Sequence, residues 1–268
     1  MMHESAAYLR ARGVGKVDMG IILGSGLTAM NTILNEQCSF QYRDIPHLPV
    51  SGAPGHEGIL RYGVIGEKSV LMFCGRLHYY EGYPMWHVAY PVRIMQALEV
   101  ARAIVTAAAG GLNMEYLAGD LVLVTDHLNL MPDNPLRGLE DPRLGERFPD
   151  MTTAYNPAWR QRLLDGAQTA GIKLKTGTYA GLQGPSLETQ AECAFLRSVG
   201  ADLVGMSLVP EIITGVQAGI PMAAVCIVSN MAWHPGDTNP STVPEILATA
   251  EAAAPMLASL INISCSTD

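Results

Sequence analysis

The sequence predicts a single α/β domain with a mixed central β-sheet flanked by helices. First, short apolar runs that are typical of strands alternate with helical patterns along most of the chain. Second, hydrophobic residues make up 49% of the 268 residues and charged residues only 16%, which indicates a well-buried sheet and excludes a disordered chain. Third, no repeat, linker or low-complexity segment divides the sequence. We therefore expect one domain over residues 1–268.

The chain begins with a helical pattern over residues 4–12, followed by a strand and a glycine turn. The strand, residues 19–23, is a compact apolar run that enters the turn 24–27, and a helix should follow. This layout points backbone N–H groups at an anion. A tight turn capped by Ser25 would give the same pattern, and Ala29 replaces the third glycine of a dinucleotide-binding fingerprint.

Strands and helices alternate through the rest of the chain. Strands are expected where apolar runs end in glycine or polar residues, namely over 60–65 and 69–74 (a hairpin), 102–109, 121–125, 176–182, 202–206 and 222–229. Helices are expected over 84–98, 158–170, 189–199, 211–218 and in an alanine-rich segment after residue 244. The interval 131–156 is too long for a simple connection, so we expect it to be functional or an interface, with Phe148 exposed on it.

Charge and cysteine usage exclude several classes of protein. The net charge of −8 argues against a nucleic-acid partner, because nucleic-acid surfaces are normally basic. The five cysteines are scattered without a CxxC or metal-ligand spacing, so we expect reduced thiols and no metal site. The N-terminus does not resemble a signal peptide, and no run of about 18 uncharged apolar residues occurs. We expect a cytoplasmic protein with no membrane partner.

Polar side chains gather directly after the predicted strands. The loop Cys74–Gly82 carries Arg76, His78 and Tyr80, and the arginine fork fits a phosphate group. Other candidate positions also follow strands, namely Ser25, residues 108–111, Glu188, Met206, Ser207 and Asn230. Because ligands of open α/β sheets bind at strand ends, this regularity predicts one anion-binding site at the edge of the sheet.

Each of these side chains also has a structural explanation. Arg76 could form a structural salt bridge, Glu188 could stabilise a helix N-terminus, Ser207 could belong to a turn, and Asn230 could cap one. Three further side chains could serve packing or solvation alone: His56, His78 and Tyr80. His127 follows an aspartate on a strand, where neighbours point to opposite faces, so we prefer a structural role. No GxSxG elbow or HExxH motif occurs, which argues against serine-hydrolase and zinc-protease chemistry.

Taken together, the loops resemble the low-molecular-mass, trimeric class of purine nucleoside phosphorylases. The matching segments keep their order and spacing, namely ILGSGL at 22–27, GRLHYYEGY at 75–83, AAGG at 108–111, DHLN at 126–129, NPLRG at 134–138, GPSLET at 184–189, VGMS at 204–207, VPE at 209–211 and SN at 229–230. The resemblance implies a mixed, partly barrel-like sheet and reversible phosphorolysis of a purine nucleoside to free base and (deoxy)ribose 1-phosphate. It also implies phosphate as a co-substrate, no metal or organic cofactor, and a homotrimer.

The resemblance assigns roles to individual residues. Phosphate would be held by Ser25, Arg76, His78, the backbone at Ala108, and Ser207, with His56 closing over it. The ribose would meet Tyr80 and Met206, and the base would meet Glu188 and Asn230. Phe148 would reach into the sugar pocket of a neighbouring subunit. The catalytic residues would be His78, Glu188 and Asn230.

The implied chemistry favours 6-oxopurines. Asn230 can donate to O6 and accept from N7 as that nitrogen gains a proton, and this bond strengthens as the purine leaves as an anion. An ionised Glu188 can accept from N1–H, which adenine lacks. Inosine and guanosine are therefore the expected substrates, in purine salvage. A non-catalytic nucleoside-binding protein is a separate hypothesis.

Three positions depart from the family pattern. Ala107 stands where asparagine is usual, which could remove a hydrogen bond, and Leu187 replaces a phenylalanine that walls the base and sugar. Val243 replaces the histidine for the 5′-hydroxyl and resembles the methylthioadenosine phosphorylase branch. The alternative is therefore a 5′-methylthionucleoside (methylthioinosine or methylthioadenosine) phosphorylase. That branch recognises adenine with aspartates, whereas Met-Ala follows Asn230 here, and the Trp-His-Pro insertion at 233–235 could supply the missing donor.

Overall fold

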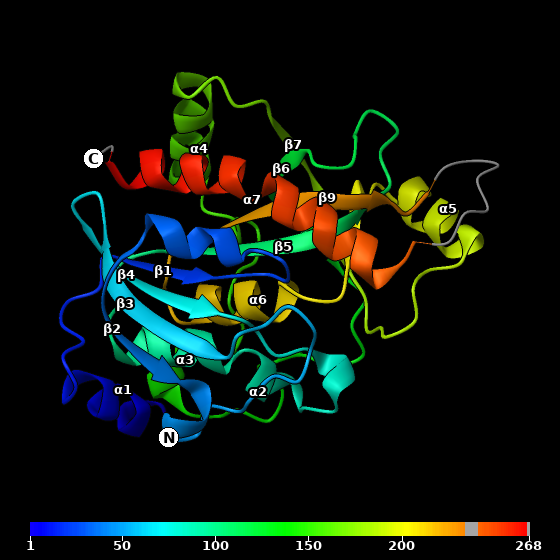
Figure 1. The fold of residues 1–268 in the computed structure, drawn as a ribbon. Helices are drawn as coiled ribbons and strands as arrows, with labels where there is room; N and C mark the ends of the chain where they lie inside the picture. Colours follow the sequence, from blue (N-terminus) through cyan, green and yellow to red (C-terminus); the bar gives the residue numbers. More distant parts are fainter. Residues whose placement is uncertain (234–240, 267–268) are drawn as a thin grey trace.

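A mixed sheet of nine strands forms the centre of the part of the chain that the computed structural model describes, residues 1–233 and 241–266 (Figure 1). The strand order is β2-β3-β4-β1-β5-β8-β7-β6-β9. β9 also pairs with β5, so the last five strands close into a ring, which confirms the expected partly barrel-like sheet. The strands are β1 Met19–Ile22, β2 Asn35–Gln41, β3 Ile59–Ile65, β4 Lys68–Cys74, β5 Ala103–Gly111, β6 Leu121–Asn129, β7 Leu174–Gly181, β8 Leu203–Gly205 and β9 Met222–Met231.

Helices cover both faces of this sheet (Figure 1). α4 and α7 pack on one face, and α1, α3 and α6 on the other, while α5 packs on β7 and β8. The helices are α1 Met2–Arg10, α2 Met85–Val88, α3 Tyr90–Ala97, α4 Pro157–Thr169, α5 Gln190–Ser198, α6 Val209–Gln217 and α7 Val243–Ser266. Short 3₁₀ turns lie at Thr28–Ile33, Tyr42–Asp44, Tyr79–Glu81 and Pro142–Leu144.

The two-residue period of the central strands divides the core between these faces. In β1, Ile21 packs on the α4 and α7 side, whereas its neighbour Ile22 packs on the α1, α3 and α6 side. In β5, Ile104 and Val105 divide in the same way. Because both faces of β1 and β5 are buried, these strands are apolar apart from Thr106, and this nearly continuous pattern made them recognisable in the sequence.

The structure differs from the sequence-based prediction at three places. The edge strand β2 was not predicted, because its mostly exposed residues (NEQCSFQ) give no apolar alternation. The helix expected over 84–98 is two helices that meet at Ala89, where Pro91 cannot donate a helical hydrogen bond. The helix expected after the glycine turn is a short 3₁₀ turn, Thr28–Ile33.

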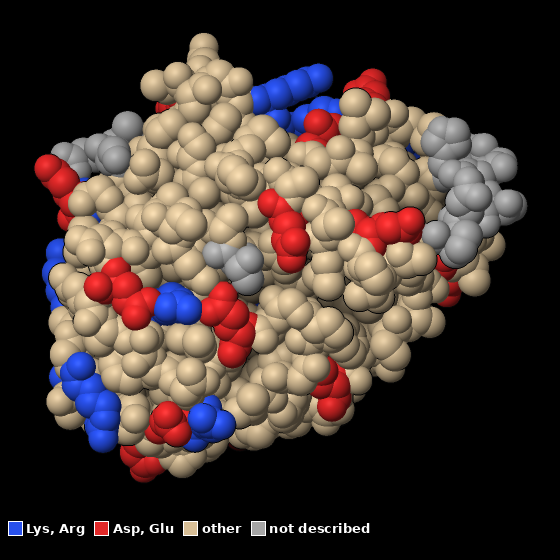
Figure 2. All heavy atoms as spheres, in the orientation of Figure 1, with Lys and Arg blue, Asp and Glu red and all other residues tan. Residues whose placement is uncertain are grey.

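α7 is long and apolar enough to span a membrane by length and composition alone. In the structure, however, its side chains Ala254, Leu257 and Ile261 are buried in the core beside α4 and the sheet. About 39% of this apolar window is buried, so packing explains part of its pattern. Figure 2 shows one face of the molecule, made mostly of uncharged residues with acidic and basic side chains scattered over it, as expected from the low charged fraction.

Candidate active site

A cavity of about 780 Å³ lies at the carboxyl ends of the parallel strands β1, β4, β5 and β9. Its volume is in the range of small-molecule sites. Eleven of the sequence-predicted residues line it: Ser25, Arg76, His78, Tyr80, Ala108, Leu187, Glu188, Met206, Ser207, Asn230 and Val243. Strand-end loops as far apart in sequence as those of Ser25 and Asn230 therefore meet at one site, as expected from the sequence.

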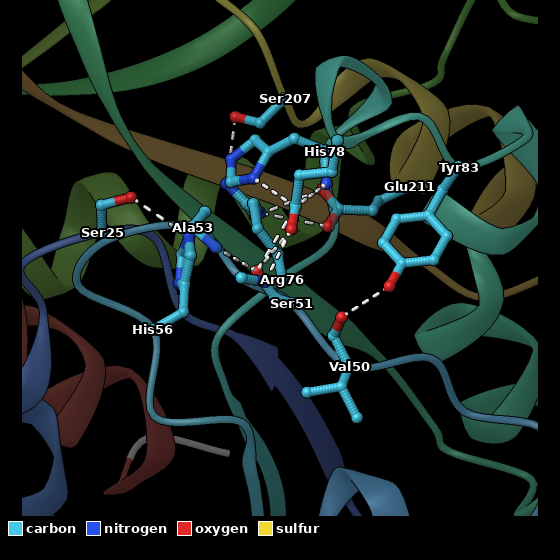
Figure 3. Close-up of polar contacts among 12 residues, drawn as sticks. Ser25, Val50, Ser51, Ala53, His56, Arg76, His78, Tyr83, Ser207 and Glu211 are labelled. Atoms are coloured by element: carbon cyan, nitrogen blue, oxygen red, sulfur yellow. Dashed lines mark hydrogen bonds and ion pairs between the residues drawn. The ribbon is translucent and has the colours of Figure 1, made fainter.

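Arg76 forms the buried polar centre of one end of this cavity (Figure 3). It follows β4, and the residue as a whole is only 1% exposed. One terminal nitrogen, Nη1, donates to Ser207 Oγ at 3.1 Å, and Nε donates to Glu211 Oε1 at 3.2 Å. The salt bridge considered in the sequence analysis therefore exists, but the arginine also lines the cavity. The two interpretations of Arg76 are compatible.

Two histidines lie beside this arginine. His56 Nε2 is 3.2 Å from Ser25 Oγ, and the rings of His56 and His78 have centroids 5.2 Å apart. His78 in turn stacks on Tyr80, with ring centroids at 4.7 Å. Burial lowers the pKa of His56 to about 3 and also lowers the pKa of His78, so both rings are neutral near pH 7. His56 does not line the cavity itself but reaches it through Ser25.

Glu81 orients His78 through contacts with its backbone and its ring. Its carboxylate accepts from the His78 backbone N–H at 2.8 Å and lies 3.3 Å from His78 Nδ1. Burial disfavours ionisation of Glu81, but hydrogen bonds from His78 and from the Gly52 backbone outweigh it and lower the pKa of Glu81 to about 2. An ionised Glu81 holds a proton on Nδ1, which leaves His78 Nε2 as the ring nitrogen free to face a ligand.

The other functional pair, Glu188 and Asn230, comes from different elements. Glu188 precedes α5, whose capping box consists of Thr189 and Glu192. Because Glu192 already provides the first-turn acid, Glu188 is not needed to stabilise the helix terminus. Burial raises the pKa of Glu188 above its ordinary value. A half-buried carboxyl group that lines a cavity and lacks a capping role is a candidate ligand-binding group.

Asn230 at the end of β9 has both ends of its amide engaged. Its Oδ1 accepts from Ser229 Oγ at 2.9 Å, and its Nδ2 donates to Ser241 Oγ at 2.9 Å. These contacts fix the orientation of the Asn230 amide, with its oxygen toward Ser229 and its nitrogen toward Ser241. Ser241 also lines the cavity. A ligand atom that accepts from Nδ2 would therefore either replace the Ser241 hydroxyl as acceptor or bind to the second N–H of the amide.

Some predicted residues lie away from the cavity. Phe148 is 84% exposed on the long loop and does not line it. His127 bonds through Nδ1 to the Tyr155 hydroxyl at 3.0 Å, outside the cavity. Of the insertion at 233–235, residues 234 and 235 lie outside the described part of the chain.

Several features in and beside the cavity were not predicted. Ile246 and Leu247 of α7 add apolar surface beside Val243. Ser241 was missed because no pattern in the sequence links it to Asn230. Glu211 was part of the VPE motif at 209–211, but its contact with Arg76 joins residues 135 positions apart and leaves no local signal.

Comparison with known proteins agrees with this geometry. A family profile described as "Phosphorylase superfamily" matches residues 18–264. Purine nucleoside phosphorylase 1 of Geobacillus stearothermophilus is 42% identical over 250 residues, which cover 93% of this chain and 91% of the relative. The chain belongs to the purine nucleoside phosphorylase family. Purine nucleoside phosphorylase of Bos taurus is 40% identical over 232 residues, covering 85% of this chain and 80% of that protein.

Solved structures of the family have the same fold. Schistosoma mansoni purine nucleoside phosphorylase in complex with adenosine superposes with a TM-score of 0.94 at 32% identity, covering 99% of this chain and 96% of that one. The inosine complex of the same enzyme gives 0.93 at 31% identity, with coverage of 100% and 96%. The family resemblance and the fold class expected from the sequence are thus confirmed.

Proposed function

We propose that this protein is a purine nucleoside phosphorylase that cleaves 6-oxopurine nucleosides reversibly with phosphate. The observation that carries the proposal is the composition of this cavity. Its arginine end, with Ser207, offers donors to an anion, and His78 Nε2 offers an acceptor for a phosphate hydroxyl, while Glu188 and Asn230 offer an acceptor and a donor–acceptor pair to a purine. The names of the relatives support this function.

The phosphate end binds through directed hydrogen bonds. Arg76, Ser207 and Ser25 can donate to phosphate oxygens, as can the backbone N–H of Ala108, and the unprotonated Nε2 of His78 can accept from a phosphate hydroxyl group. Such donors hold the nucleophile beside the sugar and stabilise the positive charge that develops on it. Phosphate is thus a co-substrate, and the proposed chemistry requires no metal or organic cofactor.

Bond cleavage transfers an electron pair to the purine. A phosphate oxygen bonds to C1′ of the ribose as the C1′–N9 bond breaks, and the purine leaves with the bonding pair and takes a proton from water at N7. Asn230 Oδ1 accepts from N7–H and Nδ2 donates to O6, where negative charge accumulates. Because both bonds strengthen in the transition state, they raise kcat rather than only ground-state binding.

Recognition of the base depends on Glu188. Its carboxylate accepts from N1–H of hypoxanthine or guanine and from the 2-amino group of guanine. Adenine has no N1–H, so it cannot make this bond with an ionised carboxylate. Burial raises the pKa of Glu188, so the N1–H bond also serves to keep the group ionised when substrate is bound.

The alternative substrate class is a 5′-methylthionucleoside, and one observation favours it. Val243, Ile246 and Leu247 of α7 all line the cavity and present apolar groups. Leu247 also lies near Gly55, next to the Ser25 turn, so this apolar wall is close to the phosphate end. A 5′-methylthio group would gain contact there, whereas a 5′-hydroxyl would lack a partner from Val243.

A substrate panel tests both classes. Inosine, guanosine, adenosine, 5′-methylthioinosine and 5′-methylthioadenosine are each incubated with phosphate, and kcat/KM for released base is measured. We expect inosine and guanosine to be cleaved far better than adenosine. A kcat/KM for methylthioinosine well above that for inosine would support the alternative, a 5′-methylthionucleoside phosphorylase. Purine binding without any phosphate-dependent product would refute both.

We also propose a homotrimer in which Phe148 contacts the site of a neighbouring subunit. The 84% exposure of this aromatic side chain leaves its ring accessible to a neighbouring subunit. Light scattering coupled to size-exclusion chromatography measures the mass directly, and a monomer at micromolar concentration would contradict it. Cytoplasmic location stays a prediction, supported by five unpaired cysteines.

A further inference from the structure

A buried ion pair holds the cavity arginine from behind. Arg76 Nη2 lies 3.2 Å from Glu211 Oε2, and Arg76 Nε donates to Oε1 of the same carboxylate at 3.2 Å (Figure 3). The two side chains are only 2% and 1% exposed. The contact consists of one hydrogen bond, from Nε to Oε1, and one close ion-pair approach, between Nη2 and Oε2, which form no hydrogen bond with any described residue. It leaves Nη1 free to donate to Ser207.

Glu211 and Ser207 approach the guanidinium from one short segment of chain. Between them, Leu208 has φ 63° and ψ −51°, and the Val209 N–H donates to the Ser207 carbonyl at 2.7 Å. This is a γ-turn with a positive φ at a buried leucine, a conformation that costs energy and persists only where surrounding contacts enforce it. The turn brings the Ser207 hydroxyl and the first turn of α6 to the same arginine.

Stability alone does not account for this arrangement. Burial of an ion pair costs desolvation energy, and apolar residues of similar volume often stabilise a core as well or better. Glu211 does not line the cavity, so it influences a ligand through the groups that it contacts, of which Arg76 lines the cavity. A free arginine side chain has several rotatable bonds, whereas a guanidinium held at Nε and Nη2 has one orientation.

We propose that Glu211 is a positioning residue for phosphate binding: it fixes the Arg76 guanidinium so that its remaining edge faces Ser207 and the anion. The pair carries no net charge, so phosphate affinity at this end depends on the direction of the donors. This inference rests on the proposed function, because it takes phosphate as the ligand of Arg76.

Three variants test the proposal. Glu211→Gln keeps the size of the side chain but replaces one acceptor oxygen with a donor that opposes the guanidinium. Glu211→Asp keeps the charge but shortens the reach to Arg76. The matched control, Thr214→Val, alters a buried side chain on the same helix whose hydroxyl has no hydrogen-bond partner among the described residues.

Calorimetric titration with inorganic phosphate, without nucleoside, gives the direct measurement. We expect Kd for phosphate to rise about 10- to 100-fold in Glu211→Gln and about 10-fold in Glu211→Asp, since small misplacements of a positioning group have effects of this size. Thr214→Val should bind like the wild type. KM for phosphate should follow Kd, whereas KM for inosine at saturating phosphate should change less than about threefold.

The outcomes separate this inference from the proposed function. A wild-type protein that neither binds phosphate nor releases base refutes the function. A wild type that binds phosphate while both Glu211 variants bind it equally well, or more tightly, overturns the positioning role. A lower Tm with unchanged phosphate Kd would show that the pair is only structural. If Glu211→Gln does not fold, Glu211→Asp, which keeps the buried charge, decides the test.

Discussion

Replacement of Asn230 by alanine should remove most of the catalytic rate while leaving the fold intact. The substitution deletes the amide that meets O6 and N7 of the departing purine. Its two hydrogen-bond partners are not stranded, because Ser229 Oγ also lies 3.2 Å from the Ala109 carbonyl and Ser241 is partly exposed to solvent. The cost in stability should therefore be about 1 kcal/mol or less, which lowers Tm by at most about 4 °C.

The kinetic effect should be much larger than this. Loss of one preorganised donor to a developing anion typically reduces kcat about 100- to 1,000-fold, or about 2.7–4 kcal/mol. The assay is steady-state phosphorolysis of inosine, with KM for phosphate measured in parallel and expected to stay unchanged. Asn113→Ala, which removes a part-buried amide bonded to Asp202 outside the cavity, is the matched control and should retain kcat. A kcat within about threefold of the wild type in a folded Asn230→Ala protein would refute the leaving-group role.

Three further predictions concern the base, the histidines and the subunit contact. Glu188→Gln should lower kcat/KM for inosine about 10- to 100-fold, because hydrogen bonds to charged groups are stronger than neutral ones, and an equal loss with adenosine would contradict N1–H recognition. The pKa of His56 is about 3 in the fold against an ordinary 6.5, so unfolding takes up a proton between these values and stability falls as the pH drops from 6.5 toward 3. Urea unfolding across this range should show a weaker pH dependence for His56→Asn, and identical slopes would refute it. Phe148→Ala should raise KM for the nucleoside about tenfold without lowering Tm if a neighbouring subunit uses this ring, and an unchanged KM would speak against the contact.

The parts of the fold that could be predicted are those with a strong local pattern. β1 and β5 are largely apolar on both faces, and α6 has a proline as its second residue, so their positions follow from short windows of sequence. β2 is an exposed edge strand with polar residues and gives no such signal. The closing of β9 onto β5 could not come from local pattern at all, because it depends on pairing between distant strands and entered only through the family resemblance.

The site shows the same division. Arg76 and His78 were recognisable because a short loop after a strand concentrates them, and strand-end loops converge in α/β sheets. Their partners were not recognisable, because they are distant in sequence. Glu211 contacts Arg76 from helix α6, and Ser241 accepts from Asn230 eleven positions away. The role of Glu188 could not be predicted from sequence either. Only the structure shows that Thr189 and Glu192 form the capping box, so that Glu188 is available to bind a ligand.

Product analysis with inosine tests the central claim most directly. The purified protein is incubated with inosine in the presence and absence of inorganic phosphate, with the base quantified by chromatography and the sugar product by phosphorus NMR. The account predicts equal amounts of hypoxanthine and ribose 1-phosphate with phosphate present, and neither product without it. Release of hypoxanthine with free ribose in the absence of phosphate, or no release under either condition, would contradict it.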